Sequence, residues 1–148
     1  MKANERKKYC DFLWALLIKA RAGFQSELSG KLDSLHSHHL RGKAGYSLRY
    51  NLDNGICLTS GEHLYMAHNT SRQFQFENMV KQLRGKDIFE RLEKIKNGTG
   101  KKLTEYEADL TNELRPYAEK IKEYYEAKNY KTKQIKTFYN KLLEEICQ

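Results

Sequence analysis

The sequence predicts a mostly helical α+β protein in which two short strands are followed by a helix and surrounded by further helices. Three observations support this prediction. Apolar residues recur at three-to-four spacing near the N-terminus, short apolar stretches replace that pattern between Gly30 and Thr59, and helical spacing returns after Asn69. A chain of 148 residues fits a single domain, 1–148, that is large enough to bury a core.

The N-terminal segment is expected to form a helix over about residues 4–22, ended by Gly23, since glycine commonly follows the last helical turn. Basic residues before an apolar run also faintly imitate a secretory leader. Asp11 and Lys19 bracket that run at the short limit, however, and no stretch approaches the roughly 18 apolar residues of a membrane span. We therefore expect a cytoplasmic protein that makes no contact with a membrane.

The middle of the chain is expected to form two strands joined by a long loop. Short apolar stretches at residues 32–40 and 55–58 flank a segment rich in Gly, Arg and Asn. Thr59 or Ser60 can then cap a short helix, because their hydroxyl groups accept hydrogen bonds from the first backbone N–H groups of a helix. The local order is strand, loop, strand and helix.

The C-terminal region, about residues 71–148, is expected to be helical throughout. Its apolar residues keep helical spacing, with breaks at residues 97–100 and at Pro116. Thr104 followed by Glu107 is typical of a capping box and predicts a helix start there.

The charge of the chain indicates a polyanionic partner. Lys and Arg outnumber Asp and Glu by 27 to 19, giving a net charge of +8, which favours nucleic acid, although an ordinary basic surface gives the same balance. Cys10, Cys57 and Cys147 are an odd number without CxxC spacing. They predict neither a disulfide framework nor a thiolate zinc site, which agrees with a reducing compartment.

Four of the five histidines fall within residues 38–68, in an arrangement suited to a one-metal nuclease. Such an enzyme needs ligands that converge on one ion and a separate imidazole that takes a proton from water. His38 and His39 are neighbours on a strand, so they point to opposite sides and can divide these two tasks. His63 and His68 follow at a spacing of five, which shares a helix face less well than a spacing of four. The alternative is a set of polar side chains satisfied within a small core.

Residues 26 to 69 resemble the HNH, or ββα-metal, endonucleases, with small phage-type enzymes as the nearest analogues and colicin DNases as more distant ones. The resemblance lies in Ser37-His38-His39, Leu52-Asp53-Asn54-Gly55-Ile56-Cys57-Leu58 and Glu62-His63-Leu64-Tyr65-Met66-Ala67-His68. It implies a ββα-metal core over about residues 26–70, made of a two-stranded antiparallel hairpin plus a helix and embedded in additional helices. It also implies His38, His63 and His68 as metal ligands, His39 as general base and Asn54 as the amide that positions the loop or the base.

The cofactor implied by the resemblance is one divalent cation, with Mg or Mn as the usual ions and Zn or Ni as alternatives for a histidine-rich site. Many relatives also carry two Cys pairs for a structural zinc. Those pairs would fall near Ser26 and Ser29, then near Thr59 and Glu62, and none of these residues is Cys. We therefore expect no structural zinc and a fold held by its apolar core.

The expected function is hydrolysis of DNA phosphodiester bonds by a phage-type or mobile-element nuclease in the host cytoplasm. Arg41, Lys43 and Arg49 lie beside the double histidine, where cations can contact DNA phosphates, although a solvated loop has similar charges. The alternatives are a non-catalytic nucleic-acid-binding protein that retains the HNH fold and an RNA-cleaving toxin of the same core. The oligomeric state, including a homodimer, is left open.

Overall fold

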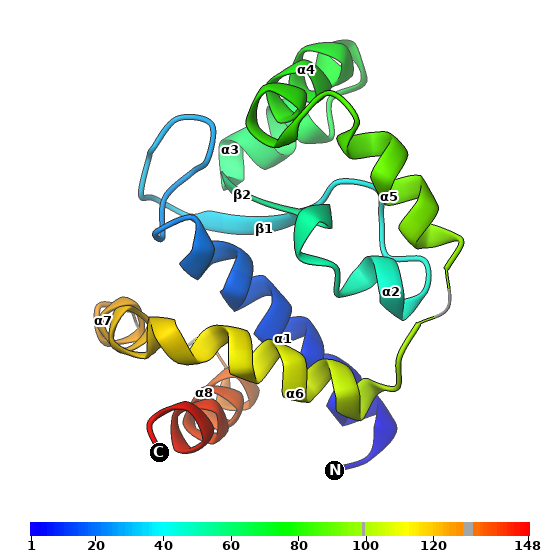
Figure 1. The fold of residues 1–148 in the computed structure, drawn as a ribbon. Helices are drawn as coiled ribbons and strands as arrows, with labels where there is room; N and C mark the ends of the chain where they lie inside the picture. Colours follow the sequence, from blue (N-terminus) through cyan, green and yellow to red (C-terminus); the bar gives the residue numbers. More distant parts are fainter. Residues whose placement is uncertain (99, 129–131) are drawn as a thin grey trace.

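The computed structural model describes residues 1–98, 100–128 and 132–148. It is mostly helical and contains one two-stranded antiparallel sheet (Figure 1). Three short segments, η1, η3 and η4, are 3-10 turns, and η2 is a π-helix. In chain order the elements are α1 (Ala3–Arg21), β1 (Leu35–His39), α2 (Tyr46–Arg49), η1 (Leu52–Asn54), β2 (Gly55–Thr59), α3 (Ser60–Glu62), η2 (His63–Ala67), η3 (Thr70–Arg72), α4 (Gln73–Arg84), α5 (Ile88–Lys96), α6 (Leu103–Leu114), η4 (Arg115–Tyr117), α7 (Ala118–Glu126) and α8 (Lys133–Ile146).

The predicted α+β class, mostly helical with a short hairpin, is confirmed. The first strand is shorter than the apolar stretch 32–40, and the loop between the strands contains α2 and η1, which the pattern did not predict. None of the helices in the described part of the chain has the length and apolar character needed to cross a membrane.

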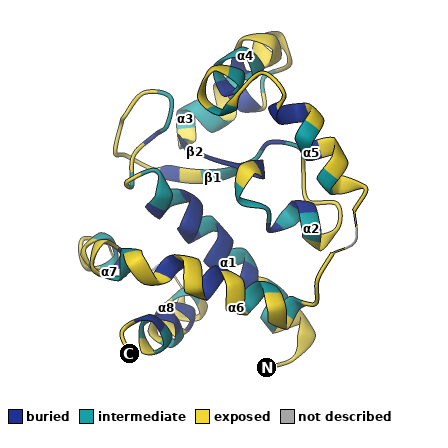
Figure 2. Ribbon diagram, viewed as in Figure 1, coloured by how far each residue is buried: buried dark blue, intermediate teal, exposed yellow. Residues whose placement is uncertain are grey.

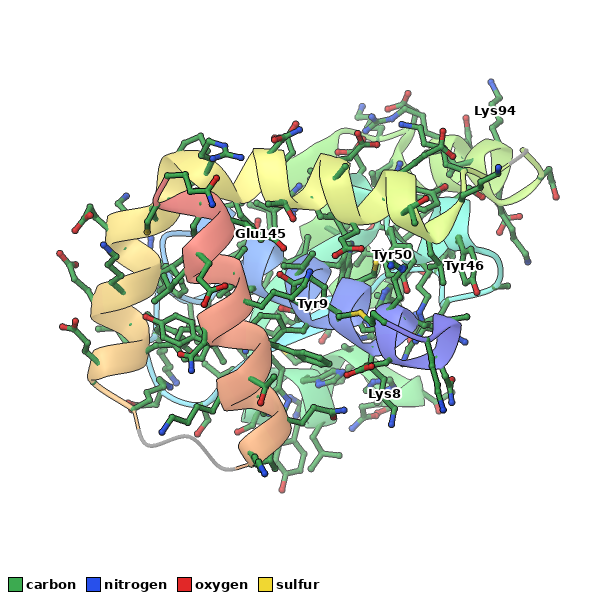
Figure 3. The ribbon with its side chains drawn as sticks, turned by 90° about the horizontal axis from the view of Figure 1, so that it is seen from below. Lys8, Tyr9, Tyr46, Tyr50, Lys94 and Glu145 are labelled. Atoms are coloured by element: carbon green, nitrogen blue, oxygen red, sulfur yellow. The ribbon has the colours of Figure 1, made fainter. Side chains whose placement is uncertain are left out.

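Helix α1 lies at the centre of the molecule and is buried along most of its length (Figure 2). Gly23 ends it as predicted: its backbone has a positive φ of 71°, and its N–H donates to the Ala20 carbonyl at 3.0 Å. In Figure 3, which views the molecule from below, α6 runs alongside α1, and Tyr9 lies between α1 and α8. The buried side chains of α1 are Tyr9, Cys10, Leu13, Trp14, Leu16, Leu17, Ile18 and Ala20.

The two strands pair in a register that gives the sheet two different faces. His39 lies opposite Gly55 and His38 opposite Ile56. Ser37 donates its hydroxyl to the Ala15 carbonyl at 2.6 Å, so Ser37 and, two residues on, His39 face α1. His38 faces the other side, and the two histidines therefore diverge as predicted.

Apolar residues form one cluster on each side of the sheet. The first contains the buried side of α1, Cys57 of β2 and residues of α6, α7 and α8. The second contains Ile56 and Leu58 of β2 with residues of α4 and α5. Cys57 is fully buried in the first cluster.

Gly55 allows α1 to pack directly on β2. A Cβ atom added there would lie 2.3 Å from Ile18 Cδ1 and 2.7 Å from Trp14 Cζ2, far inside normal contact distance. The helix and the strand can approach this closely only because the residue between them has no side chain. This approach brings the indole of Trp14 against the end of β1.

The predicted capping box at Thr104 and Glu107 is wrong. Helix α6 begins two residues earlier than that box implies, at Leu103 after the cap residue Lys102, and the Glu105 carboxylate accepts the backbone N–H of Lys102 at 2.8 Å. Thr104 therefore lies inside the first turn. Pro116 starts a new element as expected, in the turn η4 that leads into α7. Of the predicted break at 97–100, Thr99 lies outside the described residues.

Candidate metal centre

A capping box starts the helical segment that carries two of the candidate ligands. Thr59, the last residue of β2, accepts the N–H of Glu62 on its hydroxyl at 3.2 Å, and the Glu62 carboxylate accepts the N–H of Thr59 at 2.8 Å. These two bonds join the end of β2 to α3. They thereby fix the position of His63 relative to the sheet.

The chain continues from α3 as the π-helix η2, and this conformation brings His63 and His68 together. The N–H of His68 donates to the His63 carbonyl at 3.2 Å, five residues back. The π-helix therefore places residues at a spacing of five one above the other, which an α-helix does not. The Nε2 atoms of the two rings lie 2.9 Å apart.

His38 completes a group of three imidazoles. Its ring centroid lies 4.8 Å from that of His63 and 5.0 Å from that of His68. One ligand nitrogen from each ring can be chosen so that all three lie within 4.8 Å of one another. Within the described residues, these are the only three side chains of metal-binding type that meet in this way.

The surroundings of His38 and His63 favour the neutral imidazole, which is the form that binds metal. Burial, together with the smaller effects of the neighbouring His63, His68 and His39, lowers the pKa of His38 to about 3. Burial also lowers the pKa of His63, with His68 and His36 acting in the same direction. His38 is the most enclosed of the three ligands and His68 is exposed, so the group opens to solvent at one side.

The donor set fits a divalent ion. Nitrogen ligands about 2.0–2.1 Å from a tetrahedral ion lie roughly 3.3 Å from one another. The Nε2 atoms of His63 and His68 are already near that separation. The ligand nitrogen of His38 needs to move toward them by no more than about 1.5 Å. Three protein ligands also leave one coordination position for water or substrate, which is the pattern of catalytic sites.

His39 projects from the opposite side of β1 and is held in one orientation. Its Nε2 lies 2.9 Å from the Arg49 carbonyl, and its ring stacks on the indole of Trp14. A carbonyl can only accept, so Nε2 carries the proton and Nδ1 keeps the free lone pair. Burial lowers the pKa of His39 despite the hydrogen bond to Arg49, which acts to raise it. At neutral pH the ring is therefore a free base.

Asn54 is fully buried and fixes the loop between the strands. Its side-chain oxygen accepts the backbone N–H of Arg41 at 2.8 Å. Its amide nitrogen donates to the carbonyls of Gly42 and Leu48, both at 3.0 Å. Two roles were weighed for Asn54 from the sequence, and in the structure it contacts the loop. The carbonyl that contacts His39 comes from Arg49 instead.

All four predicted histidines border one pocket of about 450 Å³. The pocket lies beside β1, and α1 contributes part of its wall. The lining residues are Asp11, Trp14, Ala15, Ser37, His38, His39, Gly42, Lys43, Arg49, His63 and His68.

Two of the three predicted DNA-binding cations are engaged within the molecule. Arg49 makes a bidentate ion pair with Asp11, with contacts of 2.6 and 2.7 Å, and Tyr50, labelled in Figure 3, donates to the same carboxylate. Arg41 pairs with Glu77 at 2.9 Å and lies over the ring of Phe89.

Lys43 differs from both arginines. It borders the pocket, and the structure shows no ion pair for it among the described residues. It is therefore the predicted cation that remains available to a phosphate.

The four positions at which zinc-binding relatives would carry Cys do come together. Ser26 donates its hydroxyl to the Glu62 carboxylate at 2.6 Å and accepts the N–H of Ser29 at 3.2 Å. The same carboxylate binds the N–H of Thr59. Hydrogen bonds at this place thus connect the loop between α1 and β1, called the N-terminal loop below, to the start of α3.

Sequence reasoning missed three side chains at the site. His36 contacts His63 through its ring. The sequence could have predicted this contact, because residues 36 and 38 lie on the same face of a strand. Trp14 and Asp11 belong to α1, whose helical pattern gives no information about which loop it packs against.

Comparison of the chain with protein-family models, with curated proteins and with solved structures gave no match. The proposal for its function therefore depends on the geometry of its own residues.

Proposed function

We propose that this protein is a metal-dependent DNA endonuclease of the HNH, or ββα-metal, class. The observation that carries the proposal is that the side chains of His38 and His39 leave β1 on opposite sides and have different partners. His38 meets His63 and His68 on one side, whereas His39 is oriented separately on the other side, and all four border the same pocket. The order hairpin then helix, with Asn54 fixing the intervening loop, agrees with the class.

In this proposal His39 is the general base. Its Nδ1 accepts a proton from the attacking water, while the Arg49 carbonyl holds the Nε2 proton and Trp14 holds the ring plane. A divalent ion bound by the other three histidines would supply Lewis acidity to the scissile phosphate and to the leaving 3′ oxygen. The products would be a 5′ phosphate and a 3′ hydroxyl.

The ligand set favours a transition metal. Three imidazoles without a carboxylate suit Zn²⁺ or Ni²⁺ better than Mg²⁺, which prefers oxygen ligands. We therefore place Zn²⁺ and Ni²⁺ ahead of the Mg²⁺ and Mn²⁺ that the resemblance alone suggests.

DNA is the proposed substrate because the chain carries a net charge of +8 and an unpaired lysine, Lys43, at the pocket. Such a cation would position a phosphate without reading base sequence. We expect weak sequence preference.

The test is conversion of supercoiled plasmid by protein stripped of metal and then supplied with Mg²⁺, Mn²⁺, Zn²⁺ or Ni²⁺. His39→Ala should abolish conversion while Zn²⁺ binding and DNA affinity persist. Lys136→Ala, on the exposed face of α8, should cleave like the wild type and so controls for effects of substitution and purification in general. A contaminating nuclease would cleave in the His39→Ala preparation as well. Equal cleavage by wild type and His39→Ala would remove the proposed base.

The same assay separates the alternatives. RNA offered beside DNA would be cut preferentially by an RNA-cleaving toxin. DNA binding without cleavage in any of the four metals would indicate the non-catalytic binding protein.

A further inference from the structure

A fourth imidazole contacts the candidate metal centre from outside it. His36 precedes His38 by two residues on β1, and both side chains lie on the face of the sheet that meets η2. The Nδ1 atom of His36 lies 3.0 Å from Nδ1 of His63, with the two ring planes 88° apart. His36 is exposed and does not belong to the group of three ligand nitrogens.

The two nitrogens of His63 face different partners. Nε2 lies 2.9 Å from Nε2 of His68, another candidate ligand, and Nδ1 lies 3.0 Å from Nδ1 of His36. An ion held by Nε2 of His63 is therefore out of reach of His36, because the two ring nitrogens point away from each other. This arrangement makes His36 a neighbour of a ligand and not a fourth ligand.

The position of the proton follows from these contacts. A nitrogen that binds metal must offer its lone pair, so a neutral His63 that binds through Nε2 carries its only proton on Nδ1. The 3.0 Å contact then becomes a hydrogen bond in which Nδ1–H of His63 donates to Nδ1 of His36. A neutral His36 that accepts this bond on Nδ1 has its own proton on Nε2.

We propose that His36 is a positioning residue that holds the His63 ring, in its Nδ1–H form, with Nε2 directed at a divalent cation. The inference rests on the metal site of the proposed function but not on its nuclease chemistry. Ligand histidines gain both orientation and basicity when the second ring nitrogen donates to a fixed acceptor. Here the acceptor comes from β1 and the ligand from η2, so the contact also ties the two ligand-bearing elements together.

Three substitutions at position 36 separate this role from simple packing. His36→Ala removes the acceptor. His36→Asn places an amide oxygen at the same number of bonds from the backbone as Nδ1 and keeps it. His36→Asp supplies a stronger, charged acceptor at that place.

The measurement is the Zn²⁺ dissociation constant of the full chain, without DNA, by competition with a chromophoric chelator. His36→Ala should bind Zn²⁺ about 10 to 100 times more weakly than the wild type, as for other partners of ligand histidines. His36→Asn should recover most of the loss, and His36→Asp should bind at least as tightly as the wild type. In the Zn²⁺-loaded wild type, ¹⁵N NMR of the His63 ring should show the proton on Nδ1.

Two results would overturn the inference: equal Zn²⁺ affinity for His36→Ala and wild type, or no recovery in His36→Asn. A loss of thermal stability in metal-free His36→Ala would not obscure the test. The Zn²⁺ affinities of His36→Asn and His36→Ala can be compared directly, because both variants lack the imidazole and only the first keeps an acceptor. If the wild type itself bound no Zn²⁺, the metal site and hence the proposed function would fail, which is a different outcome from failure at position 36 alone.

Discussion

The imidazole of His39 lies parallel to the indole of Trp14, with ring centroids 3.8 Å apart and planes within 8°. The two residues come from β1 and from α1, so the N-terminal helix contributes directly to the orientation of the proposed base. Trp14 is itself held, since its indole N–H donates to the Asn51 carbonyl at 3.0 Å. A surface that holds one face of a catalytic ring limits its rotation and favours one reactive geometry.

Trp14→Phe should therefore lower DNA cleavage more than metal binding. The smaller ring leaves His39 less constrained, and small displacements of a catalytic group cost about tenfold or more in rate. Trp14 does not stack on His38, His63 or His68, so the Zn²⁺ dissociation constant should stay within about threefold of the wild-type value. Single-turnover cleavage and Zn²⁺ titration of the same preparation measure the two effects. A parallel fall in both would show that Trp14 acts only through the overall fold.

Gly55→Ala should destabilise the protein and disturb the same stack. The new methyl group would overlap Ile18 and Trp14, and overpacking of this kind costs about 1 to 3 kcal/mol. Gly61→Ala is the matched control, because its Cβ would meet no atom closer than 3.9 Å and the residue lies in α3. That control should keep or raise stability by up to about 1 kcal/mol. Chemical denaturation of both variants gives the comparison, and similar stability for the two would contradict the close approach of α1 to β2.

Glu62→Gln should weaken the junction between the N-terminal loop, β2 and α3 in a pH-dependent way. Burial raises the pKa of Glu62, but hydrogen bonds from Ser26 and from the Thr59 N–H outweigh it and hold the pKa below its ordinary value of 4.5. A lowered folded-state pKa stabilises the fold above pH 4.5, and this stabilisation is lost as the pH falls through the folded value.

At pH 7 we expect Glu62→Gln to unfold about 1 kcal/mol more easily than the wild type. The difference should begin to shrink below pH 4.5, where the unfolded wild-type carboxyl group takes up a proton, and should be lost as the pH falls through the lower folded-state pKa. Urea unfolding at several pH values measures it. A gap that stayed constant down to pH 3 would exclude a role for the carboxylate charge.

Lys43→Ala should weaken DNA binding and reduce its salt dependence. Loss of one phosphate contact lowers the slope of log K against log salt concentration by about 0.9. Lys136→Ala, on α8, should leave that slope unchanged. Arg49→Ala should instead lower stability, because its guanidinium is committed to Asp11. Fluorescence anisotropy across a salt series measures the slopes, and equal slopes for Lys43→Ala and wild type would remove Lys43 from the interface.

The sequence predicted the secondary structure well because its apolar spacing and its glycine and proline breaks act locally. Helix α1, both strands and the break at Pro116 follow from such patterns. The π-helix η2 does not, because nothing in the spacing of His63 and His68 distinguishes an unfavourable α-helical pair from a π-helical one. The expectation that His63 and His68 share a helix face poorly assumed α-helical geometry.

The rest of the site depends on contacts between distant segments. Asp11 and Trp14 reach the pocket only because α1 packs on β2 at Gly55, and no periodicity encodes that docking. The same packing pairs Arg49 with Asp11, which changes its role from a predicted phosphate contact to a link within the protein. Residue type and spacing thus predicted the three histidines that meet, whereas tertiary packing decided the partners of His39.

The most direct measurement of the central proposal is a crystal structure of Zn²⁺-soaked protein with anomalous scattering recorded at the zinc edge. The proposal predicts one strong peak bonded to nitrogens of His38, His63 and His68 at about 2.0–2.1 Å, with His39 unbound and still hydrogen-bonded to Arg49. An ion bound through His39, or no peak at the three histidines in protein saturated with Zn²⁺, would contradict it.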